Sequence, residues 1–164
     1  MTESLQQLGA QLGAQLDCSR DQTLAAFHAP LAQLDRPYAP GKWTGRQMLL
    51  HIVDCETSFL DRLKRLLADP KPLLWALDPD AWNARLAFPT RSLTIAKTLF
   101  LAQRAAVHEL LESVNEAEWS KLGVHSEAGK VSVREVATKV IAHNVHHLAQ
   151  VEAAIAGRTW IKAG

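Results

Sequence analysis

Long apolar runs are absent from this sequence of 164 residues. Even the segment MLLHIV, residues 48–53, is well short of the roughly 18–20 residues that cross a bilayer, and it carries a histidine. The first residues, MTESLQQLGAQ, also lack the basic region and apolar run of a signal peptide. We therefore expect a soluble protein with no membrane partner.

Cysteine is scarce and neither sign of charge dominates. Cys18 and Cys55 are too few for a disulfide framework, which predicts a reduced, cytoplasmic setting. Eighteen Lys and Arg residues against seventeen Asp and Glu residues leave a net charge of +1, which argues against a nucleic-acid partner. The one local basic cluster, Arg62, Lys64 and Arg65, is interpreted as a solvated helix face. The sequence also lacks a Ser-His-Asp nucleophile elbow, a phosphate-binding glycine loop and a nucleotide fingerprint.

The residues that are present predict a single helical domain spanning residues 1–164. The composition, 48% hydrophobic and 21% charged, is typical of a folded protein with a real core. No segment alternates convincingly like a strand, whereas four have helical spacing. Thr44 with Gln47 and Ser132 with Glu135 have the spacing of capping boxes, which start helices. We expect helices over residues 3–34, from Thr44 to just before Pro70, from Thr90 or Ser92 through Leu111, and from Ser132 through Ile155.

The connection between the second and third predicted helices is long and stiff. It contains Pro70, Pro72, Pro79 and Pro89, together with Trp75 and Trp82. Bundles in which each helix reverses direction use short loops of about 2–8 residues. A connection of this kind is better suited to crossing the length of a bundle, so the second and third helices are expected to be parallel.

Histidines on two of the predicted helices are candidate metal ligands. His143 and His147 are four residues apart on an apolar stripe, so their side chains lie about 40° apart around the helix and one turn of about 5–6 Å along it. Two such imidazoles can bind one metal ion, and His51, on the inward face of the second helix, is the best third ligand. Cys55 is either a soft extra ligand or a small buried thiol. The alternative is that the histidines are hydrogen-bonded core residues without a metal.

Two further residues are candidates for proton transfer. Asp54 lies three residues after His51, and His125 lies in the segment before the last helix. Either is expected to accept a proton or to orient a ligand, although a solvated loop position is equally open for His125. We also expect the long connection to cover a pocket at this site, with Trp75 or Trp82 nearby.

The segments that carry these residues resemble those of a known protein family. Residues 42–56, KWTGRQMLLHIVDCE, resemble the segment that opens the second helix in the DinB-like family of bacterial four-helix bundles. Residues 131–152, VSVREVATKVIAHNVHHLAQVE, resemble that family's terminal helix with its H-x-x-x-H pair. The tryptophan-containing stretch LLWALDPDAW, residues 73–82, also suits the family. The distinctive feature is the order: Lys-Trp-Thr before a helical histidine, then a final helix with paired histidines.

The resemblance implies an all-α four-helix bundle in an up-down-down-up arrangement. It further implies a divalent metal ion, nickel or zinc, held by His51, His143 and His147. Relatives include thiol-dependent transferases and proteins named as metal-dependent hydrolases without a known substrate, and many form homodimers. We expect any homodimer to use an apolar face of the second and third helices.

Three functions are consistent with this sequence. The first is a metal-dependent enzyme that hydrolyses a small-molecule substrate or transfers a low-molecular-weight thiol to it. The second is a non-catalytic metal- or ligand-binding stress-response protein. The third is a structural bundle whose histidines are core residues.

Overall fold

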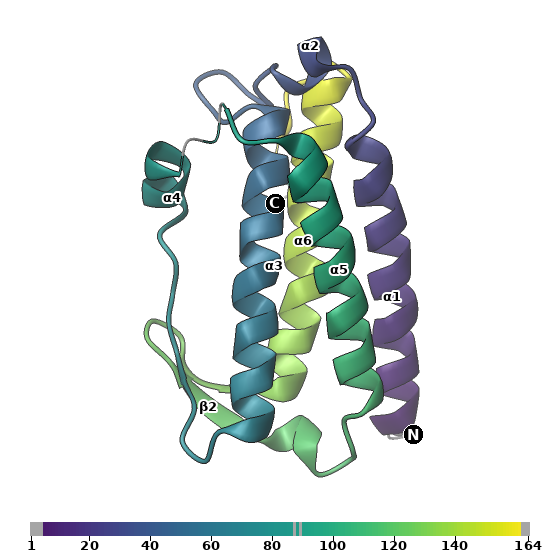
Figure 1. Ribbon diagram of the computed structural model, residues 1–164, viewed down its shortest axis with the longest axis vertical. Helices are drawn as coiled ribbons and strands as arrows, with labels where there is room; N and C mark the ends of the chain where they lie inside the picture. Colours follow the sequence, from purple (N-terminus) through teal and green to yellow (C-terminus); the bar gives the residue numbers. More distant parts are fainter. Residues whose placement is uncertain (1–4, 87, 89, 162–164) are drawn as a thin grey trace.

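Four long helices form the body of the protein (Figure 1). The computed structural model describes residues 5–86, 88 and 90–161. Figure 1 shows the first and last of the long helices running one way and the middle two running the other, which confirms the up-down-down-up bundle. None of the described helices is both long and apolar enough to cross a membrane. The long helices are α1 (Leu5–Ala26), α3 (Gly45–Ala68), α5 (Leu93–Glu112) and α6 (Val133–Ile155).

The starts of these helices follow local side-chain chemistry. The Thr44 hydroxyl accepts from the Gln47 backbone N–H, and the Gln47 side chain accepts from the Thr44 N–H, so the predicted capping box of α3 is confirmed. An equivalent box begins α6 at Ser132. Ser92, rather than Thr90, caps α5.

The first predicted helix is divided in two. The expected start at Glu3 lies outside the described residues, and α1 ends at Ala26. A short helix, α2 (Leu31–Leu34), follows Pro30. Because proline has no N–H to donate and clashes with the preceding turn, the chain cannot continue α1 through this position.

The connection between α3 and α5 crosses the length of the bundle, as expected. Figure 1 shows it climbing beside α3 from the end of that helix to the start of α5, with the short helix α4 (Pro79–Arg85) on the way. The parallel direction of α3 and α5 follows from this crossover.

The bundle also carries a small sheet that the sequence did not indicate. Three short strands form one sheet in the order β1 (Leu73–Leu74), β2 (Leu122–His125), β3 (Gly129–Ser132). β1 is parallel to β2, and β2 is antiparallel to β3. Gly123 permits this packing, because a Cβ there would lie 2.8 Å from Leu66 Cδ2 and 3.0 Å from Pro72 Cγ. Strands of two to four residues are too short to show alternation in the sequence.

The core consists of two apolar clusters separated by a layer of buried polar side chains. One cluster lies toward the sheet and includes Phe59 and Val107; the other lies toward α2 and includes Leu49 and Phe100. Between them, every long helix contributes at least one buried polar residue. This polar layer comprises Ser19, Thr23, Glu56, Arg104 and Asn144.

Candidate metal centre

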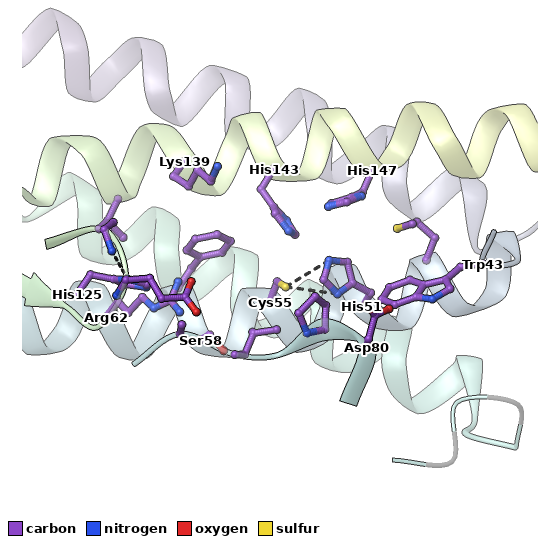
Figure 2. A pocket seen from close by; sticks show the side chains of 18 of the residues that line it. Trp43, His51, Cys55, Ser58, Arg62, Asp80, His125, Lys139, His143 and His147 are labelled. Carbon is purple, nitrogen blue, oxygen red and sulfur yellow. Dashed lines mark hydrogen bonds between the residues drawn. The ribbon is translucent and has the colours of Figure 1, made fainter. Parts of the chain in front are cut away.

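Three histidines from two packed helices lie together beside the core. α3 packs directly against α6, which places His51 opposite His143 and His147. The ring centres of His143 and His147 are 4.4 Å apart, and that of His51 is 5.2 Å from the first and 4.8 Å from the second. Figure 2 shows the three rings pointing into the same space between the two helices. The structure thus brings together the three residues that the sequence singled out.

The environment keeps all three rings neutral. Burial, together with a smaller effect of the neighbouring histidines, lowers the pKa of His51 to about 4 and that of His143 to about 2. Burial also lowers the pKa of His147, against the effect of its hydrogen bond to Gln150. A neutral imidazole has one nitrogen lone pair to offer. The cluster therefore presents three lone pairs at neutral pH.

Two contacts around the rings suit metal binding. The His147 Nδ1–H donates to Gln150 Oε1 at 2.7 Å, so the lone pair of His147 is on Nε2. A hydrogen bond of this kind, on the ring nitrogen that does not bind, is what fixes the orientation of metal-ligating histidines. His143 Nδ1 is buried and has no hydrogen-bond partner among the described residues. Such an orphaned nitrogen is costly unless something occupies the space it faces.

Cys55 lies one turn beyond His51 in α3 and reaches the same cluster. Its Sγ is 3.7 Å from His51 Nδ1 and 3.6 Å from His51 Nε2. The candidate ligand atoms of His51, Cys55 and His143 all lie within 4.8 Å of one another, a group that does not include His147. Burial and the neighbouring carboxylates raise the pKa of Cys55 to about 12, so the thiol carries its proton unless a cation displaces it.

A cavity of about 780 Å³ lies against the histidine cluster (Figure 2). The crossover forms one wall through Ala76, Leu77, Pro79 and Asp80, as expected. The expected tryptophans do not line it: Trp75 is 74% exposed, and Trp82 also lies outside it.

Trp43 is the tryptophan of this cavity. It stands at the end where His51 lies, with its ring centre 5.3 Å from that of His51. A position just before the cap of α3 gave no sequence signal of this role, although the Lys-Trp-Thr run of the family resemblance includes it.

The structure treats the two proton-transfer candidates differently. Asp54 does not reach the cavity, because Arg91 holds both of its carboxylate oxygens, at 2.6 and 2.8 Å. His125 does line the cavity, from the end of β2. Its Nδ1 accepts the backbone N–H groups of Glu127 and Ala128, at 3.2 and 3.3 Å. The neutral His125 ring therefore carries its hydrogen on Nε2.

Three more polar residues of the site were not identified from the sequence. Gln150 could have been found, because it follows His147 by three residues on the same helix face. Lys139 lines the cavity one turn before His143. Arg62 also lines it, so its interpretation as part of a solvated basic face is wrong, while Lys64 and Arg65 are exposed as expected.

Comparisons with known proteins agree on one family. The sequence model of the DinB superfamily matches residues 15–151. A Bacillus licheniformis protein named "Putative metal-dependent hydrolase" is 31% identical over 126 residues, covering 74% of this chain and 69% of the relative. A Geobacillus thermodenitrificans protein of the same name is 33% identical over 122 residues, covering 73% and 67%.

A solved structure supports the same assignment at the level of the fold. YfiT from Bacillus subtilis, described as having an unusual four-helix bundle topology, superposes with a TM-score of 0.82 at 20% identity. The superposition covers 89% of this chain and 85% of YfiT. Since the family model also spans most of the sequence, this protein belongs to the DinB superfamily.

Proposed function

We propose that this protein is a metal-dependent enzyme in which His51, His143 and His147 hold one divalent ion. The observation that carries the proposal is the convergence of three neutral imidazoles from two helices on one space beside a cavity. Relatives named as metal-dependent hydrolases support it. Three nitrogen ligands suit zinc or nickel and leave a coordination position open.

The residues around this site orient the ligands or contact the substrate. A bound ion of this class acts as a Lewis acid and lowers the pKa of a coordinated water or thiol. Gln150 orients His147, and Trp43 packs against His51 and restricts its ring. His125 presents its Nε2–H as a hydrogen-bond donor to substrate, rather than the proton acceptor expected from the sequence. Asp54 has no part in proton transfer, because Arg91 occupies both of its oxygens.

The reaction is hydrolysis of a small molecule, or transfer of a low-molecular-weight thiol to one. Both use an open position on the ion for a nucleophile, water in the first case and a thiolate in the second. Turnover of an electrophilic substrate that requires added thiol identifies the transferase, and turnover in water alone identifies the hydrolase. A metal-loaded protein with neither activity against a broad panel would favour the non-catalytic metal-binding alternative.

The variant His147→Ala tests the metal site itself. Protein purified without a nickel column is analysed for bound metal, and its helical content is measured by circular dichroism. The variant is expected to lose the ion and keep its helices. His146→Ala is the matched control, because His146 is the preceding residue on α6 and lies outside the cavity, with its ring against Trp160 and 4.8 Å from that of His147. Full metal content in the His147 variant would contradict the proposed ligand set.

A homodimer is also part of the proposal. Ile95 and Leu99 lie one turn apart on α5 and are 70% and 40% exposed. Exposed apolar side chains at this spacing form a stripe that a second copy could cover. No large exposed apolar side chain of the described residues lies on α3, so α5 alone is the proposed face.

A further inference from the structure

Arg62 and His125 stand at the end of the cavity away from Trp43 (Figure 2). Arg62 comes from the second half of α3, and His125 from the end of β2. Neither residue belongs to the proposed ligand set, and a ligand in the cavity would meet both.

The guanidinium of Arg62 is held in place by groups that do not neutralise it. Its Nη2 donates to the Trp75 backbone carbonyl at 2.6 Å, and its central carbon lies 5.5 Å from the Phe59 ring centre. Its Nε is buried without a hydrogen-bond partner among the described residues. Within the described part of the chain, no carboxylate oxygen lies within ion-pair distance of it. The structure thus orients a half-buried cation and leaves its charge unpaired.

Two other arginines that reach the interior have a carboxylate partner, whereas Arg46, which has none among the described residues, does not line the cavity. Arg104 faces Glu56 at 2.6 Å, and Arg91 faces Asp54 at the same distance. A desolvated charge without a counter-charge is expensive, and burial indeed lowers the pKa of Arg62. An anionic ligand would remove that cost.

The neighbouring groups favour an anion over a cation at this end. Lys139 lines the cavity and makes no hydrogen bond or ion pair among the described residues. His125 offers its Nε2–H. Of the three acids near this end, Asp61 pairs with Arg65 at 2.7 Å. Glu135 is held by the backbone N–H and hydroxyl of Ser132, both at 2.7 Å. Glu127 is exposed on the turn after β2 and lies beyond ion-pair distance of Arg62.

An apolar surface joins this end to the histidines. The Phe59 ring that supports Arg62 also packs against His143, with ring centres 5.4 Å apart. Leu77 and Val136 line the cavity as well. A ligand lying along Phe59 would therefore have one end at the guanidinium and the other at the imidazoles.

We propose that the substrate is an organic anion, a carboxylate or a phosphate ester, whose charged group pairs with Arg62 and whose apolar part lies on Phe59. The N–H groups of the planar Arg62 guanidinium donate to the anion, and the His125 Nε2–H is a second donor. Only the placement of the reacting end at the histidines rests on the proposed function, because the anion site itself needs no metal ion.

Binding to metal-free protein tests this site without activity. The probes are 3-phenylpropionate, its neutral amide and 2-phenylethyl phosphate, with affinity followed by calorimetry. The wild type is expected to bind at least one of the two anions about tenfold or more tightly than the amide, the range of a charge-assisted hydrogen bond. The better of the two anions identifies the class. Absence of binding, or equal affinity for the amide and both anions, would overturn the proposal.

Two substitutions of Arg62 and one control locate the effect. Arg62→Gln should remove the preference for the anion, while Arg62→Lys, which keeps the charge but not the planar guanidinium, should retain part of it. Arg65→Gln, the same change on an outward position of α3, should retain all of it. A preference that persists in Arg62→Gln, or is lost in Arg65→Gln, refutes the site. If Arg62→Gln does not fold, an unaltered preference for the anion in Arg62→Lys refutes the claim that the Arg62 guanidinium geometry recognises the anion.

Metal analysis of the same proteins separates this inference from the proposed function. A wild type that prefers anions but binds no divalent ion would refute the metal-dependent enzyme and leave the anion site standing. A wild type that binds the ion but shows no anion preference would refute only the anion site.

Discussion

Replacing Arg104 with methionine removes the cation from the polar layer that divides the core. The Arg104 and Glu56 side chains are each 1% exposed, and Arg104 Nη2 lies 2.6 Å from Glu56 Oε1. Nη1 of Arg104 also donates to Ser19 Oγ at 3.1 Å. Methionine fills much of the same volume without offering a donor. The variant therefore leaves the Glu56 carboxyl buried and without its main partner.

The expected loss of stability in Arg104→Met follows from the Glu56 charge that remains in the core. Removing one partner of a buried ion pair destabilises a protein by about 3–5 kcal/mol. Burial already raises the pKa of Glu56 to about 7, although Arg104 pulls it down. Without Arg104 that pKa rises further, so the folded variant binds a proton that the unfolded chain releases above its ordinary carboxyl pKa. The variant is therefore expected to lose more stability at pH 8 than at pH 5.

Urea unfolding followed by circular dichroism measures both effects. Adding Glu56→Gln to Arg104→Met should recover most of the loss, because no buried charge remains. Arg20→Met is the control, since its ion pairs with Asp17 and Asp21 are on the surface and contribute well under 1 kcal/mol. A loss for Arg104→Met below about 1 kcal/mol, or one independent of pH, would refute the argument from a stranded carboxylate.

Three other outcomes follow from the site and the surface. Gln150→Leu should weaken metal binding about 10–100-fold by releasing the His147 ring, which competition with a chelating dye measures; unchanged affinity would show that the hydrogen bond does not position the ligand. Metal-free protein should lose stability as pH falls below about 6.5, because the unfolded chain takes up protons that the folded cluster, with the pKa of His51 at about 4 and that of His143 at about 2, does not. The raised pKa of Glu56 acts in the opposite direction, but it is one group against several histidines. Urea unfolding at pH 5 and pH 7 checks the sign, and equal stability would contradict it. Light scattering should show a dimer that Ile95→Glu dissociates and Thr94→Glu, an exposed change on another side of α5, does not; a wild-type monomer at micromolar concentration would remove the dimer altogether.

The bundle could be predicted because its signals are local. The capping boxes at Thr44 and Ser132 involve residues three apart, and the apolar stripes recur at helical spacing. The length of the crossover, with its prolines, was enough to indicate that α3 and α5 are parallel. His143 and His147 could be paired for the same reason, since one helix determines their spacing.

The remaining features depend on contacts between distant segments. The pairing of Leu73 with Val124 joins parts of the chain some fifty residues apart, and nothing in either short strand announces it. Asp54 was a reasonable base until Arg91, from the segment before α5, was found to hold it. Arg62 looked like its exposed neighbour Lys64, because only the sheet and the crossover turn that part of α3 into a cavity wall.

The crossover separates the segments that carry the candidate metal ligands from the segments that form the opposite wall of the cavity. The histidines are borne by α3 and α6, which the core holds rigidly, whereas much of the opposite wall comes from residues 76–80 and 125–128, which lie outside the four long helices. Exchanging these two segments for those of a relative would therefore alter which molecules fit while the imidazoles keep their mutual geometry. In this architecture the shape of the cavity is interchangeable, whereas the imidazoles and the Arg62 charge, which α3 and α6 carry, are not.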